Sequence, residues 1–158
     1  MSEELFIGRE LHDALPRLLA QTRKNLRICA YELNPTTSTT QHSHRPLITQ
    51  LTAISQSAVS CKIILATSSK SANIRVNNHR AAELLAAHGW HVRLAKPHPL
   101  QHCKLWLLDD WLAIIGSHNL TVSGLLKNHE ISVTCTSAPI LAKLHRFFNE
   151  SWETSTPL

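Results

Sequence analysis

The sequence predicts an α/β domain, because segments with helical and strand-like patterns of apolar residues alternate along the chain. The length of 158 residues is that of one domain. Hydrophobic residues make up 43% of the chain and charged residues 17%, a balance typical of a globular protein that buries a core. No internal repeat or domain boundary is visible, so we expect a single domain over residues 1–158.

The first elements follow from local patterns. Residues 10–22 have the apolar spacing of a helix, with Asp13 as its cap and Pro16 in its first turn. The alternation in NLRICAYEL predicts a strand over 25–33. The Thr- and Ser-rich run that follows predicts a loop over 34–44.

The same order of helix and strand then repeats. A helical pattern covers about 46–57, and the short apolar run CKIILA predicts a buried strand over 61–66. A polar loop over 67–75 leads to a helix over 78–88, which ends at Gly89, a typical C-terminal signal.

The second half is richer in strands, two of which flank a tight turn at Asp109–Asp110. The expected elements are a strand over 90–94, a linker over 97–99, strands over 102–109 and 111–115, a loop over 116–119, a short turn or helix, a strand over 129–135, and a closing helix over 137–152 capped by Thr136 or Ser137.

The chain is basic, and its sequence shows no membrane or export signal. Sixteen Lys and Arg residues against eleven Asp and Glu residues give a net charge of +5, which favours a polyanionic partner such as nucleic acid. No apolar run approaches the roughly 20 residues that cross a bilayer. The opening MSEELFIGRE lacks the pattern of a secretory signal. We therefore expect a cytoplasmic protein without stable membrane association.

The four cysteines form no C-x-x-C pair, which argues against a zinc ribbon or a redox motif. In a cytosolic protein we expect them to be buried, reduced thiols, with two buried disulfides as the alternative. They are Cys29, Cys61, Cys103 and Cys135.

The candidate catalytic and binding residues lie in residues 101–130. His102 and Lys104 are two apart in a predicted strand, so their side chains point to the same face. Ser117 and Asn119 are also two apart and follow the next strand, where they return to the same end of the sheet. An ammonium, a hydroxyl and an amide suit phosphate oxygens, and a histidine can attack phosphorus or move protons.

Two acids and a glycine in this stretch have other expected roles. Side chains alternate between the two faces of a strand, and in a regular strand Asp109 would face away from His102. We therefore interpret it as a structural residue of the turn. Glu130 opens the next strand and is the candidate to accept the Nδ1 proton of His102, which would leave Nε2 free as the nucleophile. Gly116 permits a close approach of the backbone to a ligand.

The spacing H-x-K-x4-D-x6-G-S-x-N, followed by N-x-E, resembles the HKD signature of the phospholipase D superfamily. The motif covers about a fifth of the chain, and the segments Cys29-Ala30-Tyr31 and His91-Val92-Arg93 resemble the family more loosely. The resemblance implies a mixed central β-sheet flanked by helices on both faces.

Most enzymes of this superfamily carry two such motifs, whereas this chain carries one. Its resemblance to the small Nuc-like bacterial endonucleases implies a homodimer in which two copies of His102 act on one phosphate. One His102 would form a phosphohistidine, and the other would protonate the leaving oxygen and then activate water. Lys104, Ser117 and Asn119 would hold the phosphate oxygens, and the resemblance implies neither a metal nor a cofactor.

Several basic residues are secondary candidates. His118, between Ser117 and Asn119, either contacts substrate or points into packing, with packing favoured. Lys70, Arg75 and Arg80 either follow a nucleic-acid backbone or form a solvated face.

Two further pairs of residues each have a structural and a functional interpretation. His42 and His44 are surface residues by default, with contact to substrate or metal as the alternative. Trp106 and Trp111 are expected in the core or at a dimer interface rather than in base stacking.

The leading hypothesis is a metal-independent nuclease with little sequence specificity, acting on DNA in preference to RNA and depending strongly on salt. Three alternatives stay open. They are a lipid phosphodiesterase or phosphatidyl transferase, a non-catalytic nucleic-acid-binding dimer, and a metal-binding protein built on His42, His44 and the cysteines.

Overall fold

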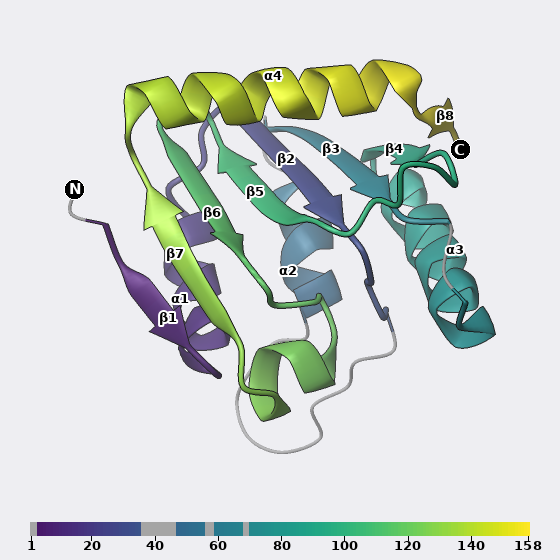
Figure 1. Ribbon diagram of the computed structural model, residues 1–158, viewed down its shortest axis with the longest axis horizontal. Coiled ribbons are helices and arrows are strands. Elements are labelled where there is room, and N and C mark those ends of the chain that lie inside the picture. Colours follow the sequence, from purple (N-terminus) through teal and green to yellow (C-terminus); the bar gives the residue numbers. More distant parts are fainter. Residues whose placement is uncertain (1–2, 36–46, 56–58, 68–69) are drawn as a thin grey trace.

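A computed structural model describes residues 3–35, 47–55, 59–67 and 70–158. Within these residues the chain forms an eight-stranded mixed sheet in the order β1-β7-β6-β5-β2-β3-β4-β8 (Figure 1). The strands are β1 (Leu5–Ile7), β2 (Asn25–Ala30), β3 (Ser60–Leu65), β4 (His91–Leu94), β5 (Lys104–Leu108), β6 (Leu112–Gly116), β7 (Ile131–Cys135) and β8 (Thr156–Pro157). The helices are α1 (Glu10–Leu19), α2 (Leu47–Ile54), α3 (Ala72–Ala87) and α4 (Ala138–Thr154), with a π-helical turn η1 (Ser123–Lys127).

The sheet joins a parallel part to an antiparallel part. Strands β2, β3 and β4 run parallel, with Ala30 opposite Leu65 and Leu65 opposite Leu94. Strands β5, β6 and β7 form an antiparallel meander, and β5 also pairs antiparallel with β2, with Cys29 opposite Leu105. The start of β5 therefore lies beside the end of β2.

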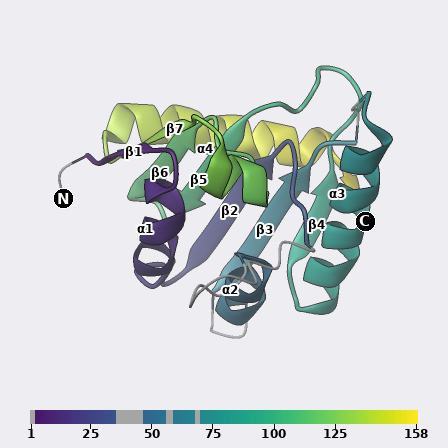
Figure 2. The ribbon, with the colours of Figure 1, turned by 90° about the horizontal axis from the view of Figure 1, so that it is seen from below.

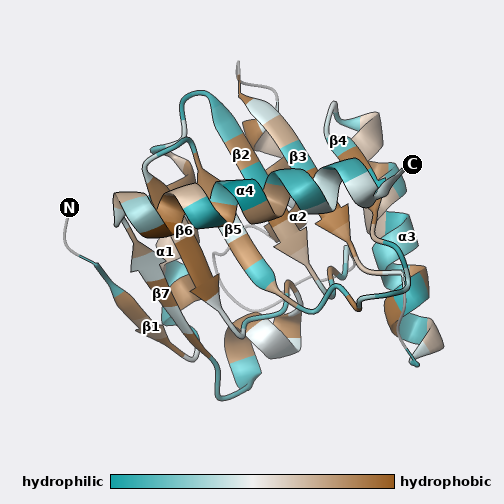
Figure 3. Cartoon of the chain, turned by 45° about the horizontal axis from the view of Figure 1, so that its top comes forward, coloured by the Kyte–Doolittle hydropathy of each residue, from teal (hydrophilic) through white to brown (hydrophobic). Residues whose placement is uncertain are grey.

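Helices cover both faces of the sheet, as the family resemblance implied. Figure 2 shows α1, α2 and α3 on one face and α4 on the other. Leu15, Leu51 and Leu85, one from each of the first three helices, are fully buried in one apolar cluster. Phe148 and Trp152 of α4 belong to a second cluster on the opposite face. Figure 3 shows hydrophobic residues along the central strands and mainly hydrophilic ones on the outward side of α4.

Two helices differ from the prediction at their N-terminal ends. Helix α1 starts at Glu10, so Pro16 lies in its interior and the expectation of Pro16 in the first turn is wrong. The Glu10 carboxylate accepts the backbone N–H of Ile7 at 2.8 Å, which fixes the start of the helix three residues before Asp13. Helix α3 starts at Ala72 and includes half of the predicted loop.

The edges of the sheet were not predicted. Strands β1 and β8 have three and two residues, too few to display an alternating pattern. Strand β1 pairs with β7 and β8 pairs with β4, so the first and last strands occupy opposite edges. No helix in the described part of the chain is long and apolar enough to span a bilayer.

Candidate active site

Apart from Asp109, the residues of the motif gather at one end of the sheet. Strands β2 and β6 end there, and β5 and β7 begin there. Lys104, Gly116 and Ser132 stand opposite one another on the three neighbouring strands. The antiparallel meander thus brings Lys104 and Gly116 of the motif, and the start of β7 just after Glu130, to the same end of the sheet.

Backbone hydrogen bonds join the loop after β6 to the segment after β2. The N–H of Leu120 donates to the carbonyl oxygen of Glu32 at 2.9 Å. The carbonyl oxygen of Leu120 in turn accepts the N–H of Asn34 at 3.1 Å. This places Asn119 beside the end of β2. The Oδ1 atom of Asn119 is buried and accepts no hydrogen bond from the residues that the structure describes.

His102 and Lys104 form the centre of the site. His102 is exposed and lies two residues before β5, not within the strand as expected. Lys104 Nζ lies 3.4 Å from Nδ1 and 3.5 Å from Nε2 of His102. The ammonium also donates to the His102 carbonyl oxygen at 2.9 Å. An accessible imidazole is therefore held next to a fixed positive charge.

Tyr31 supports both of these side chains. Its ring centroid lies 4.5 Å from that of His102, with the ring planes tilted by 52°. Lys104 Nζ lies 5.2 Å from the centre of the same ring, within the range of a cation–π interaction. Tyr31 follows β2 directly, so its position depends on the end of that strand.

Asn78 of α3 fixes the backbone around Tyr31. Its Nδ2 donates to the carbonyl oxygens of Tyr31 and Ala66, both at 2.8 Å. Its Oδ1 accepts the N–H of Leu33 at 2.8 Å. The Asn78 residue is 1% exposed, so these three bonds satisfy a fully buried amide and tie the ends of β2 and β3 to α3.

Burial and charge set the protonation of the site. Two effects lower the pKa of His102. The larger is partial burial, and the second is the positive charge of Lys104. Burial also lowers the pKa of Lys104, against the opposing effect of the nearby carboxylates of Glu130 and Glu32. Burial raises the pKa of the Glu32 carboxyl, while Lys104 acts in the opposite direction. The site therefore favours a neutral, nucleophilic imidazole.

Glu130 holds Ser117 rather than His102. The Ser117 hydroxyl donates a short hydrogen bond to Glu130 Oε2, and Asn128 Nδ2 donates to Oε1 at 3.2 Å. Within the described residues of one chain, His102 has no hydrogen bond to Glu130. The expectation that Glu130 orients the histidine of its own chain is therefore corrected, because its oxygens face Ser117 and Asn128.

Gly116 allows two strands to approach each other closely. A Cβ atom at this position would collide with the Ser132 hydroxyl and with the carbonyl oxygen of Ile131. The Ser117 N–H donates to that same carbonyl oxygen at 2.9 Å. The close approach expected at Gly116 is thus made to β7 of its own sheet, which sets the position of Ser117.

Asp109 closes the turn between β5 and β6 in a left-handed conformation, with φ of 50°. Its carboxylate accepts the backbone N–H groups of Arg23, Lys24 and Asn25 at 2.9, 2.7 and 2.8 Å. Partial burial opposes ionisation, but these donors outweigh it and lower the pKa of Asp109. Asp109 therefore ties the turn to the start of β2, away from His102.

His118 does not reach the site. Its ring is buried, with Nδ1 2.7 Å from the Ser132 hydroxyl and Nε2 2.7 Å from the carbonyl oxygen of Gly8. The suggestion that His118 contacts substrate is wrong, because both ring nitrogens are engaged in the interior. The packing alternative is the one the structure shows.

The remaining basic candidates lie on the surface. Lys70 is exposed just before α3, and Arg75 and Arg80 are exposed on α3 itself. The residues His42 and His44 fall outside the described ranges. No group of three or more His, Cys, Asp or Glu residues within those ranges is arranged to hold a metal ion.

The cysteines and tryptophans serve mainly in packing. Cys29, Cys61 and Cys135 are buried free thiols, and Cys103 is a half-buried one. Trp106 is 2% exposed in the core. The partly buried Trp111 packs against the same apolar cluster.

Sequence reasoning missed three contributors to the site, namely Tyr31, Glu32 and Asn78. Tyr31 and Glu32 lie near the end of the strand predicted over 25–33, and this was a usable signal, because the ends of strands in α/β proteins often border a site. No pattern in the sequence marked Asn78, since its role depends on contacts between three distant segments.

Comparisons with known proteins agree with this architecture. The family model described as "Cardiolipin synthase, PLD-like domain" matches residues 15–152. A search of curated proteins finds no match. Among solved structures, Nuc from Salmonella typhimurium, described as a phospholipase D family member, aligns with a TM-score of 0.80 at 17% identity over 99% of both chains.

Two further structures share the fold. NucT from Helicobacter pylori aligns with a TM-score of 0.74 at 16% identity over 99% of both chains. The phosphatidylserine synthase of Haemophilus influenzae aligns with a TM-score of 0.74 at 18% identity, over 99% of this chain and 39% of that one. Because the family model spans most of the sequence and the fold agrees throughout, the chain belongs to the phospholipase D-like family.

Proposed function

We propose that the protein is a metal-independent phosphodiesterase that cleaves nucleic acid with little sequence specificity and acts as a homodimer. The observation that carries the proposal is the contact between an exposed imidazole and a fixed ammonium, His102 and Lys104. A neutral imidazole is a nucleophile, and an ammonium next to it compensates the negative charge of a phosphodiester.

The reaction proceeds in two displacements. In the first, Nε2 of His102 attacks phosphorus, the bond from phosphorus to the leaving oxygen breaks, and the His102 of the second copy gives its proton to that oxygen. In the second, the now neutral imidazole of the second copy takes a proton from water. The water oxygen attacks phosphorus, and the bond from phosphorus to Nε2 breaks. Both histidines then return to their starting protonation states.

The neighbouring polar groups would bind the phosphate. Lys104 supplies positive charge, and the amide of Asn119 and the hydroxyl of Ser117 supply donors to the non-bridging oxygens. Glu130 would orient Ser117 through the hydrogen bond between them. The role of Glu130 is then positioning rather than proton transfer.

The homodimer follows from the number of histidines that the chemistry needs. Each chain supplies one His102, whereas the two displacements use one nucleophile and one acid. A twofold axis through the site provides both from identical chains. Mixed dimers that contain one His102→Ala chain are then inactive. After subunits have exchanged in an equal mixture of mutant and wild type, about a quarter of all dimers are active, so the wild-type activity falls by about half.

The net charge of +5 favours nucleic acid as the substrate. The proposed substrate is DNA in preference to RNA. The test is cleavage of plasmid, single-stranded DNA and RNA by the purified protein in excess EDTA. Cleavage is expected to continue in EDTA and to vanish in His102→Ala, whereas His91→Ala, a change at an exposed histidine of β4, keeps it. Turnover of a phospholipid with no cleavage of any nucleic acid would overturn the proposal.

A further inference from the structure

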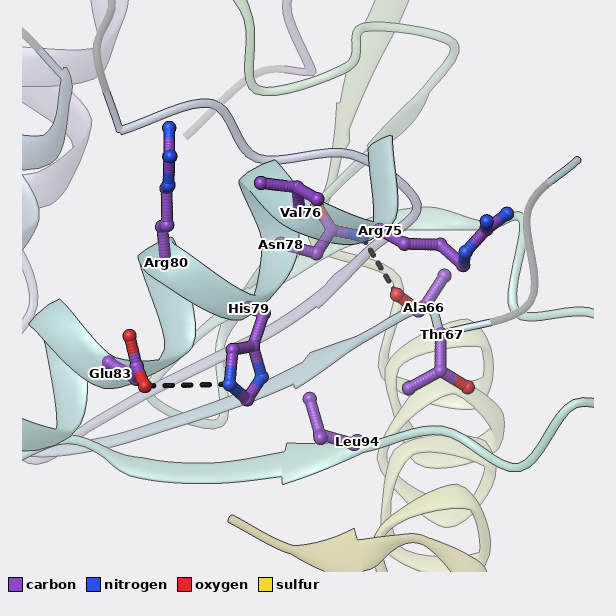
Figure 4. Close-up of a pocket in the computed structure, with 9 residues that line it drawn as sticks. All are labelled: Ala66, Thr67, Arg75, Val76, Asn78, His79, Arg80, Glu83 and Leu94. Carbon is purple, nitrogen blue, oxygen red and sulfur yellow. Dashed lines mark hydrogen bonds and ion pairs between the residues drawn. The ribbon is translucent and has the colours of Figure 1, made fainter. Parts of the chain in front are cut away.

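A groove of about 560 Å³ lies between α3 and the carboxyl ends of β3 and β4, outside the HKD motif. This volume is within the range of sites that hold a small organic group. Figure 4 shows the groove, with the side chains of α3 on one side and Thr67 and Leu94 on the other.

The groove lies next to the segment that carries Tyr31 of the candidate active site. Ala66 lines the groove and Tyr31 lies against His102, and the buried amide of Asn78 binds the carbonyl oxygens of both residues. The N–H of Ala66 donates to the carbonyl oxygen of Ala30, so the ends of the two strands are neighbours. Adjacent strands are about 4.8 Å apart, so the groove begins within one or two strand spacings of Tyr31.

The walls of the groove combine apolar groups, basic groups and one carboxylate, Glu83. Val76 and Leu94 form apolar surface, and the Val76 residue is 48% exposed. His79 projects from α3 between Glu83 and Leu94, and its Nε2 lies 3.4 Å from the Glu83 carboxylate. The guanidinium of Arg75 lies at the end of the groove near Thr67 (Figure 4).

This combination matches the chemistry of a nucleotide. A base has an apolar face that suits Val76 and Leu94, whereas the phosphate beside it suits the guanidinium of Arg75. An acyl chain would make no use of the charged groups.

From this arrangement, and resting on the proposed function, we infer that the groove binds the base of a nucleotide that flanks the phosphate held at His102. The groove thus assigns Arg75 and Val76 to a substrate subsite separate from the reacting groups. Single-stranded or locally opened nucleic acid is the form that presents a base to it.

The experiment measures binding without cleavage. A fluorescently labelled single-stranded hexanucleotide is titrated into His102→Ala protein in EDTA, and the dissociation constant is read by fluorescence anisotropy. In this background Val76→Glu places a carboxylate in the groove. Leu84→Glu is the matched control, because Leu84 is a 36% exposed aliphatic residue of the same helix that does not line the groove.

Val76→Glu is expected to weaken binding about tenfold relative to Leu84→Glu. Equal affinities for the two variants, or no binding of the hexanucleotide by the His102→Ala protein, would overturn the inference. A circular dichroism spectrum that matches the parent protein establishes that each variant is folded.

Arg75→Gln tests the same groove without adding a negative charge. It is expected to weaken hexanucleotide binding. It should also reduce the slope of the logarithm of affinity against the logarithm of salt concentration by the amount that corresponds to about one phosphate contact. Failure of the proposed function is recognised separately, as absence of cleavage by the protein with His102 intact. Weaker binding of phosphatidylglycerol vesicles by Val76→Glu, with hexanucleotide binding preserved, would assign the groove to lipid and overturn the inference.

Discussion

The ring of Tyr31 lies against the imidazole of His102, with 4.5 Å between centroids and 52° between ring planes. Because the ring also contacts the Lys104 ammonium, one aromatic side chain sets the relative position of the two groups that carry the proposed chemistry. The contact links β2 to the segment before β5, which are far apart in the sequence.

Replacing Tyr31 tests whether the ring positions the site. Tyr31→Leu is expected to lower kcat about tenfold or more, because His102 and Lys104 lose a rigid support. Tyr31→Phe keeps the ring and is expected to retain most of the activity. The measurement is steady-state cleavage of an oligonucleotide in EDTA, and equal losses in the two variants would show that the hydroxyl, not the ring, matters.

The pKa of His102 is expected to depend on Lys104. Burial and the ammonium both lower this pKa, so the imidazole stays neutral to a lower pH than an ordinary histidine. Removing the charge in Lys104→Gln removes one of the two effects, so the pKa of His102 rises and protonation occurs at higher pH. An NMR titration of ¹³C-labelled histidine measures the change directly.

Two outcomes of this titration would contradict the electrostatic account. In the first, the pKa of His102 in Lys104→Gln equals that in the wild type, and in the second it is lower than in the wild type. Because two histidines meet in the proposed dimer, their titrations are coupled, and the comparison is made on dimers of both proteins. The resonances of the other histidines report whether the substitution acts locally.

The carboxylate of Asp109 is expected to stabilise the fold rather than to take part in catalysis. Asp109→Asn tolerates the left-handed backbone but loses the charge and one accepting oxygen, so the free energy of unfolding should fall by about 1–3 kcal/mol. Asp110→Asn, at an adjacent side chain that is 76% exposed, should change it far less. Urea denaturation followed by circular dichroism measures both variants.

The pH dependence of this difference has a definite sign. The folded state lowers the pKa of Asp109, so its contribution is present above the ordinary value of 3.8 and disappears as pH falls through the folded-state value. The gap between wild type and Asp109→Asn should therefore shrink at acid pH. A gap that widens on acidification would contradict the assignment.

The cysteines are expected to differ in reactivity. Contact with the Cys29 thiol is the main cause of a lowered pKa at Cys103, whereas burial raises the pKa of Cys61 to about 12. Half-buried Cys103 should therefore react with iodoacetamide before Cys61 in the native protein, which peptide mass mapping can follow. Reaction of all four thiols in denaturant without reductant distinguishes free cysteines from the disulfide alternative.

The sequence was a good guide to the central strands and to the motif, because those signals are local. CKIILA and the run around Ile114 are apolar enough to be recognised as buried strands. Helix α3 was predicted to start too late, because its first turn is polar and Ser71 makes no side-chain cap. The orientation of His118 depends on Gly8 and that of Glu130 on Asn128, and neither contact is visible in the spacing of the motif.

The strand order of the sheet has a consequence for engineering. Strands β1 and β8 occupy opposite edges, seven strand spacings apart, or about 34 Å at about 4.8 Å each. An extended linker covers at most about 3.5 Å per residue, so a circular permutant that joins these two ends would need a connecting peptide of at least about ten residues. A new chain start placed in the Asp109–Asp110 turn would separate the two halves of the motif and would cut the link that Asp109 makes to β2.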